Sequence, residues 1–230
     1  VAVCPATEHH AVLHPVEAVG GRISRVRADG SVDLDHLAEL LDDDVAIVSV
    51  MSVNNESGQI ADLRAVRDVV DSHAPGAVLH TDAVQAVNWL DPRTAFECVD
   101  AVSLSGHKFG GPKGVGVLAV RGGVELTAQI LGGGQEAERR SGTHNTAGIV
   151  AFGAAIAELG EQRSADIERL RVERNRLAEG LVSLVPDCWE TVEREQRAAG
   201  LSQFVIEGIE SEALLLLLER GDVMASAASS

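Results

Sequence analysis

A chain of 230 residues with 45% hydrophobic and 23% charged residues has a globular composition and can bury a large core. Its formal net charge of −16 argues against direct nucleic-acid binding, which needs clustered Lys and Arg, and its longest leucine run, Leu214 to Leu218, is far too short to span a membrane. The three cysteines are widely spaced without a CxxC pair, so we expect no disulfide framework, no metal site and a reducing, cytoplasmic location.

The chain opens with an apolar stretch that predicts a strand over residues 1–6, followed by a loop or helix start at Thr7-Glu8-His9-His10 with Thr7 as the cap. A polar stretch over 22–35 predicts a short hairpin or loop, and residues 34–41 predict a helix. The next apolar run, residues 45–50, predicts a strand that leads to Asn54-Asn55.

Strand and helix patterns then alternate. Residues 61–73 carry apolar positions at helical spacing, and residues 78–83 predict a buried strand that ends at Asp82, with Gln85 three residues further on. The strand, helix, strand order predicts an α/β fold with a mainly parallel sheet and helices packed on both of its faces.

A further buried strand over residues 100–104 ends at Ser105-Gly106-His107-Lys108, before a second apolar run over 115–120. Ligands of open α/β sheets bind at the carboxyl ends of the strands, where Lys108 is expected to lie. The glycines of 110–114 lack the spacing of a phosphate-binding P-loop, and a strand rather than a helix follows them. We interpret them as room for the backbone to turn back.

The last third of the chain predicts a small-residue helix over 147–159 and a long amphipathic helix over 161–184. A strand is expected over 203–206 and a helix over 211–220. We therefore expect a large domain over residues 1–160. Residues 161–230 are expected to form a linker helix and an incomplete small α+β domain.

We expect Lys108 to be partly desolvated at this strand end, and a partly desolvated lysine loses its proton easily and condenses with an aldehyde to form a Schiff base. Pyridoxal phosphate combines an aldehyde with a phosphate, for which Ser105 and His107 are candidate donors. It also needs a carboxylate at its pyridine nitrogen, and Asp82 is the candidate. An Asp at a strand end is equally often a structural carboxylate, so this alternative stays open for Asp82 on its own.

Five segments resemble the cysteine desulfurases, a branch of the class V aminotransferases, in that family's order and at about its spacing. They are Thr7 to Leu13, Val53 to Gly58, His80 to Gln85, Ser105 to Lys108 and Arg140 to Thr143. The resemblance spans essentially the whole chain. It implies the fold type I of pyridoxal phosphate enzymes and pyridoxal phosphate as the cofactor.

The resemblance also implies roles for single residues. His9 would stack on the cofactor ring, and Asn55 and Gln85 would lie beside its phenolic oxygen, while Lys108 would hold the cofactor. Thr143 would reach the phosphate held by a second subunit, which implies a homodimer. The alternatives are structural: exposed histidines on a capped helix for His9, a turn for Asn55, and a mobile surface loop for Thr143.

The activity implied by the resemblance is a sulfur transfer that converts L-cysteine to L-alanine, with Lys108 moving the α-proton and His9 as a possible relay. The sulfur would pass to an enzyme cysteine as a persulfide and then to an acceptor protein, for instance in iron–sulfur cluster assembly. Alternatives are a selenocysteine lyase or an aminotransferase on the same fold, or a non-catalytic scaffold that retains the fold.

Two parts of the family pattern are absent from the sequence. We expect the cofactor's glycine- and threonine-containing phosphate loop before Val1, and the persulfide-forming cysteine just after the serine- and alanine-rich stretch that ends at Ser230. Cys4, Cys98 and Cys188 lie in strand-like or apolar surroundings with no adjacent basic residue. None of them is therefore a good candidate for the sulfur acceptor.

Overall fold

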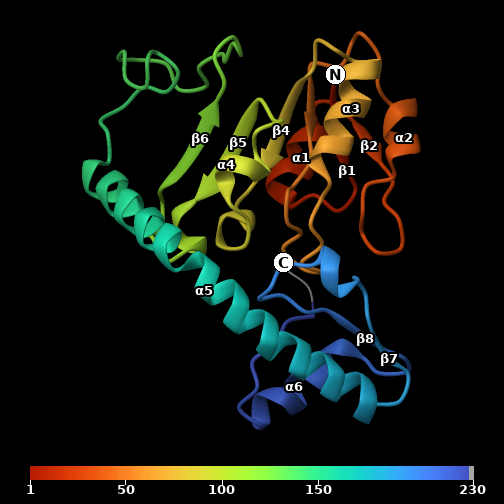
Figure 1. Cartoon of the computed structure of the whole chain (residues 1–230). Helices are drawn as coiled ribbons and strands as arrows, with labels where there is room; N and C mark the ends of the chain where they lie inside the picture. Colours follow the sequence, from red (N-terminus) through yellow and green to blue (C-terminus); the bar gives the residue numbers. More distant parts are fainter. Residues whose placement is uncertain (228–230) are drawn as a thin grey trace.

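The computed structural model describes residues 1–227. Its centre is a six-stranded sheet, and Figure 1 shows the helices around it. In spatial order the strands are β2 (Arg22–Ser24), β1 (Ala2–Pro5), β3 (Ile47–Ser49), β4 (Val78–Asp82), β5 (Ala101–Ser105) and β6 (Gly116–Val120). Neighbouring strands from β2 to β5 are parallel, and only β6 is antiparallel to its neighbour. The predicted mainly parallel α/β sheet is confirmed.

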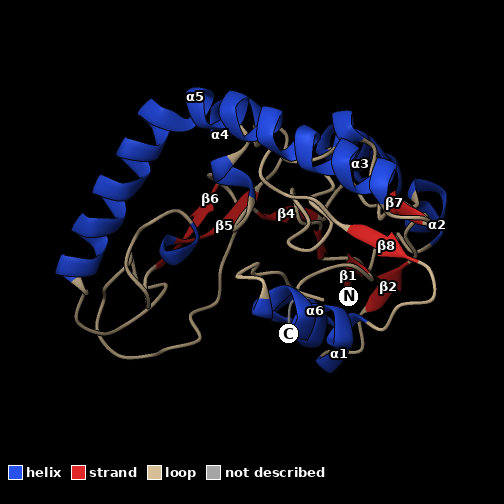
Figure 2. Cartoon of the chain, turned by 90° about the horizontal axis from the view of Figure 1, so that it is seen from below, coloured by secondary structure: helices blue, strands red, loops and turns tan. Residues whose placement is uncertain are grey.

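Helices cover both faces of this sheet, as predicted. Figure 2 shows α3 (Leu63–His73) and α5 (Thr146–Leu184) on one side of the strands and α1 (His10–Ala18) on the other. The shorter helices of the sheet region are α2 (Leu34–Glu39), α4 (Pro92–Ala95), η1 (Ala86–Asn88) and η2 (Gly106–Lys108).

Helix α3 illustrates how the apolar spacing builds the core. Asp62 caps it by accepting a hydrogen bond from the Ala65 amide at 3.0 Å. The helix buries Leu63, Val66 and Val70, and these residues belong to the same apolar cluster as the strand residues Val48 and Leu79. Burial of this stripe against the sheet therefore stabilises both elements.

The final part of the chain forms a smaller unit beside the end of α5 (Figure 1). It contains the antiparallel strands β7 (Cys188–Glu190) and β8 (Phe204–Ile206), the short helix η3 (Arg194–Gln196) and the helix α6 (Ser211–Arg220). The predicted strand over 203–206 and the predicted helix over 211–220 are confirmed.

One sequence prediction about this region is wrong. Instead of two helices over 147–159 and 161–184, the structure has one continuous helix, α5, of 39 residues. Gly160 lies inside it, where a glycine costs only about 1 kcal/mol relative to alanine. The boundary expected between residues 160 and 161 thus falls within a helix, and the division into two domains stays a prediction.

Within residues 1–227, no helix is both long enough and apolar enough to span a membrane.

Candidate functional site

The carboxyl ends of β1, β3, β4 and β5 lie at one edge of the sheet because these strands are all parallel. Most of the predicted site residues lie at these strand ends or in the short segments that follow them. They are His9 after β1, Asn55 after β3, Asp82 and Gln85 at the end of β4, and Ser105, His107 and Lys108 at the end of β5. The topology thus gathers residues from four separate segments at a single edge.

Lys108 is the last residue of η2, the single turn that follows β5. The Asn88 amide group donates a hydrogen bond to the Lys108 carbonyl oxygen at 3.0 Å, which fixes the backbone. The side chain is exposed, in contrast to the partial desolvation expected from the sequence. Next to it, Ser105 Oγ and His107 Nδ1 lie 2.9 Å apart and form a hydrogen-bonded pair of potential phosphate donors.

Asp82 provides a buried negative charge at the same edge. Asp82 is only 8% exposed, and its Oδ1 accepts a hydrogen bond from the Val84 backbone amide at 2.9 Å. Within the described part of the chain, no Lys, Arg or His side chain forms an ion pair with it. Because a buried charge is costly unless it is paired, this carboxylate is suited to bind a cationic nitrogen.

A histidine bridge lies beside Asp82 on the same face of β4, two residues earlier in the strand. His80 Nδ1 lies 2.7 Å from Ser49 Oγ on β3, and His80 Nε2 lies 2.8 Å from Ser103 Oγ on β5. Burial lowers the pKa of His80, although the nearby Asp82 charge acts in the opposite direction. The neutral imidazole therefore links three strands through hydrogen bonds directly below the candidate site.

His9, rather than the predicted Thr7, caps helix α1. Its backbone is extended, with φ −60° and ψ 148°, and its Nδ1 accepts a hydrogen bond from the Ala11 amide at 3.1 Å. Since Nδ1 is an acceptor, a neutral His9 ring carries its proton on Nε2. The ring is exposed.

The two asparagines after β3 have different surroundings. Asn54 Oδ1 accepts hydrogen bonds from the amides of Glu56 and Ser57 at 3.0 and 2.9 Å, and so shapes the turn. Gly58 closes this turn with a positive φ of 78°. The turn expected as the structural alternative thus exists, and Asn54 organises it, while Asn55 is half-buried within it.

In the described part of the chain, no hydrogen bond or ion pair joins Thr143 to this edge. It is exposed in the loop between β6 and α5 (Figure 1). Because β6 runs antiparallel to β5, the loop leaves the sheet from the opposite edge to Lys108. A role for Thr143 within the same chain gains no support from this placement.

Glu8 is a buried acidic residue at the edge that the sequence analysis did not single out. It is 5% exposed, and its Oε1 accepts a hydrogen bond from the Met51 amide. Burial, aided by the nearby Asp82 charge, raises its pKa to about 8, against the opposing effect of the Met51 hydrogen bond. In the sequence, the position of Glu8 between a strand end and His9 was the available indication that it is buried. That indication is weak, because a charged residue at a helix start usually faces solvent.

The three cysteines do not lie in environments that activate a thiol. Cys4 is fully buried, and burial together with Glu8 and Glu17 raises its pKa to about 12. Burial also raises the pKa of the half-buried Cys98, and Cys188 is 7% exposed. The thiolate is the nucleophilic form, so these positions disfavour sulfur transfer.

The stretch after which the persulfide cysteine is expected ends at 228–230, outside the described residues. In the part of the chain that the structure does describe, no group of three His, Cys, Asp or Glu side chains is arranged to hold a metal ion.

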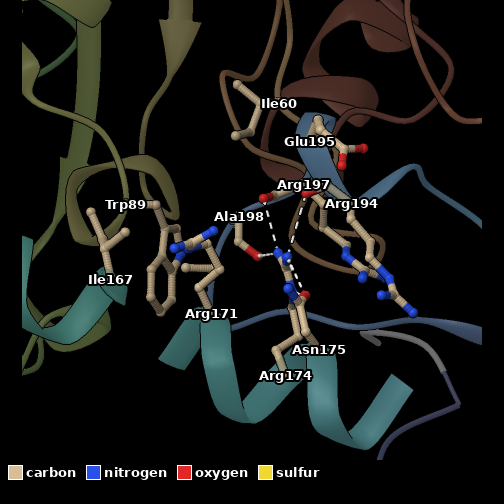
Figure 3. Close-up of a pocket in the computed structure, with 11 residues that line it drawn as sticks. Ile60, Trp89, Ile167, Arg171, Arg174, Asn175, Arg194, Glu195, Arg197 and Ala198 are labelled. Atoms are coloured by element: carbon tan, nitrogen blue, oxygen red, sulfur yellow. Dashed lines mark hydrogen bonds between the residues drawn. The ribbon is translucent and has the colours of Figure 1, made fainter. Parts of the chain in front are cut away.

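A cavity of about 360 Å³ lies between α5, the smaller unit, and Ile60 and Trp89 of the sheet region (Figure 3). Its arginines contact other protein groups, although the Arg197 guanidinium has no hydrogen-bond partner in the described residues. Arg174 donates hydrogen bonds to the carbonyl oxygens of Arg197 and Ala198 at 3.2 and 3.0 Å, and Arg197 forms an ion pair with Glu190. None of the predicted site residues lines the cavity, and we interpret it as a structural junction.

Comparison with protein families gives one match over the whole chain: the family described as aminotransferase class-V matches residues 1–230. Among curated proteins, a cysteine desulfurase of Gluconacetobacter diazotrophicus is 39% identical, over 99% of this chain and 58% of its own length. The cysteine desulfurase NifS of Azotobacter vinelandii is 35% identical, over 99% of this chain and 57% of its own length.

Solved structures have the same fold. A NifS-like protein superposes with a TM-score of 0.87 at 32% identity, covering 98% of this chain and 63% of its own. DndA from Streptomyces lividans superposes with a TM-score of 0.81 at 28% identity, covering 95% of this chain and 63% of its own. These superpositions confirm the predicted fold type I. The chain spans about 60% of the length of the relatives that it matches.

Proposed function

Because the chain belongs to the class V aminotransferase family, we propose that the protein acts as a pyridoxal phosphate-dependent cysteine desulfurase. The reaction converts L-cysteine to L-alanine and transfers the sulfur, through a persulfide on an enzyme cysteine, to an acceptor protein. The relatives named cysteine desulfurase support the choice of substrate.

One observation carries the proposal: Asp82 is a buried carboxylate with no ion pair in the described residues, one strand from Lys108. A protonated pyridine nitrogen would supply the missing positive charge. The residues present therefore fit pyridoxal phosphate. When bound, this cofactor accepts the electrons that the substrate Cα–H bond leaves behind.

Other residues at the edge would hold the cofactor by their own chemistry. Lys108 would bind its aldehyde carbon, and the Ser105–His107 pair would donate to its phosphate. His9 would cover one face of the ring, while Asn55 and Gln85 would donate to the ring oxygen without adding charge. These assignments follow the resemblance residue by residue.

Two side chains of this edge would handle protons during the reaction. Lys108 Nζ would take the Cα proton from L-cysteine and return it to the product. Because His9 Nδ1 accepts from the Ala11 amide, only His9 Nε2 would be available to pass a proton to or from the substrate. The Asp82 carboxylate would pair with the ring nitrogen and hold it in its protonated form.

The assembly belongs to the same proposal. The exposed loop that carries Thr143 would reach the phosphate group bound by a second copy of the chain, which makes the active form a homodimer. Three free cysteines suit a reducing compartment, and we infer a cytoplasmic location.

The test is an absorbance spectrum of the full-length protein, followed by borohydride reduction and peptide mass mapping. A yellow protein whose reduced adduct maps to Lys108, and which releases alanine from L-cysteine, supports the proposal. Turnover of selenocysteine alone would indicate a selenocysteine lyase, and transfer of an amino group to an oxo acid would indicate an aminotransferase. A protein that stays colourless with added pyridoxal phosphate would refute the enzyme and favour a scaffold.

A further inference from the structure

Glu8 occupies an unusual environment at the carboxyl edge of the sheet. One carboxyl oxygen, Oε1, accepts the hydrogen bond from the Met51 amide at the end of β3. The other, Oε2, is buried and has no hydrogen-bond partner within residues 1–227. An ionised carboxylate would leave much of its charge uncompensated there, whereas a neutral carboxyl group would bury far less charge.

Among the described residues, no cationic group acts on the Glu8 carboxyl. β1 contributes the neutral thiol of Cys4, and β4 contributes the Asp82 carboxylate. Helix α1 contributes Glu17, which acts on Cys4. The β3 end contributes only the Met51 amide. Burial, aided by the Asp82 charge, therefore favours the neutral form of Glu8.

A pair of hydrogen bonds connects the turn before His9 to the turn before Asn55. The Met51 backbone amide donates to the Glu8 carboxyl group. The Asn54 side-chain amide donates to the Thr7 carbonyl oxygen at 3.1 Å. Each bond includes the residue immediately before one of the two site residues: Glu8 precedes His9, and Asn54 precedes Asn55. We call this pair of bonds the β1–β3 clamp.

We propose that Glu8 is a positioning residue that works as a neutral carboxylic acid, holding the β1–β3 clamp closed and thereby setting His9 relative to Asn55. The inference rests on the proposed function, which gives His9 and Asn55 their roles at the cofactor. When Glu8 ionises, its buried Oε2 has no partner for the charge, so this edge must open to hydrate the carboxylate and the clamp loosens. Cofactor binding therefore weakens as the pH rises through the pKa of Glu8, about 8.

The experiment compares Glu8→Gln, Glu8→Ala and the control Glu17→Gln in the full-length protein. Glu17 is exposed on α1 and forms neither of the two clamp bonds, so it controls for the loss of one carboxylate near Cys4. The dissociation constant of pyridoxal phosphate is measured from about pH 6 to pH 9.5. Hydrogen exchange of the Met51 amide is measured in the protein without cofactor.

Glutamine keeps the acceptor oxygen but cannot ionise. Glu8→Gln is therefore expected to bind the cofactor within about threefold of the wild type at pH 7, and to lose the alkaline weakening that the wild type and Glu17→Gln both show. Glu8→Ala leaves the Met51 amide unpaired. We expect it to bind about tenfold or more weakly, and to exchange the Met51 amide faster.

Two results would overturn the inference: an alkaline weakening in Glu8→Gln equal to that of the wild type, or equal binding by Glu8→Ala and Glu8→Gln. If Glu8→Ala does not fold, the pH profile of Glu8→Gln decides alone.

A wild-type protein that binds no pyridoxal phosphate refutes the proposed function, and exchange of the Met51 amide then decides on the clamp. Faster exchange in Glu8→Ala alone supports the clamp, and equal exchange in all variants refutes it.

Discussion

Replacing Gly111 by alanine tests how the chain holds Lys108. The Gly106 carbonyl oxygen accepts hydrogen bonds from the amides of Phe109 and Gly111 at 3.2 and 2.9 Å, which closes a tight loop around Lys108. A Cβ atom at Gly111 would lie 2.8 Å from that oxygen and 3.1 Å from the Gly106 carbonyl carbon. Both neighbours are backbone atoms, so no side chain can rotate away, and the loop itself must move.

The expected cost follows from this contact alone, because the φ of Gly111 is not in the left-handed region. Overpacking of this kind destabilises by about 1–3 kcal/mol. For a chain of this size, each kcal/mol lowers the melting temperature by about 2–4 °C. The displaced loop also moves Lys108, so we expect less borohydride-fixed pyridoxal phosphate on this residue.

Thermal unfolding and peptide mapping of the full-length variant measure both effects. Gly76→Ala is the matched control, since a Cβ at Gly76 meets nothing within 4 Å and its φ also lies outside the left-handed region. It is expected to be neutral or slightly stabilising. If Gly111→Ala melts and labels like Gly76→Ala, the loop relaxes freely and the reasoning about Lys108 is refuted.

Asp82→Asn removes the buried charge but keeps an acceptor for the Val84 amide, so we expect the variant to fold. Its affinity for pyridoxal phosphate, measured by absorbance titration, should fall at least about tenfold. The lowered pKa of His80 means that below its ordinary value of 6.5 the unfolded chain binds a proton that the folded chain does not. His80 therefore lowers the free energy of unfolding as the pH drops below that value, opposite in sign to the contribution of Glu8. In denaturant titrations, His80→Asn should gain stability relative to the wild type toward low pH, and an unchanged difference at all pH values would contradict this origin. Arg174→Met leaves the carbonyl groups of Arg197 and Ala198 without their donor, and denaturant titration should show a loss of about 2–4 kcal/mol. An unchanged midpoint would show that water replaces the guanidinium group without cost.

The sheet and its functional edge could be predicted because each depends on local patterns. The apolar runs before Asp82 and Lys108 are short and end at polar residues, and a helical stripe separates one strand from the next. Parallel pairing then places the strand ends together, whatever the details of packing. The order of the segments along the chain therefore carried most of the information about the edge.

The continuity of α5 could not be read from the same patterns. The small-residue stretch before Gly160 and the charged stretch after it differ in composition, which suggested two helices. In the structure a single helix passes from the sheet to the smaller unit (Figure 1). A glycine in a helix interior is a modest local cost, which the packing of the rest of the helix offsets.

The state of Glu8 depends on contacts that no local window contains. Its partner Met51 lies 43 residues away, and Asp82 lies on yet another strand. Burial of a carboxyl group is decided by how three strand ends meet, and the sequence pattern shows only that each strand ends there. The exposure of Lys108 depends in the same way on how the following loop turns.

The turn that carries Asn55 is attached at both of its sides. It leaves β3 of the sheet, and its far side pairs with the smaller unit, through an isolated bridge between Gln59 and Arg197 and a hydrogen bond from the Ala198 amide to the Gly58 carbonyl oxygen at 2.8 Å. A rotation of the smaller unit must therefore pull on this turn. By thermodynamic reciprocity, a ligand that prefers one position of Asn55 also favours one orientation of the smaller unit. Ligand binding at the sheet edge would then change the position of residues in the smaller unit, far from the ligand.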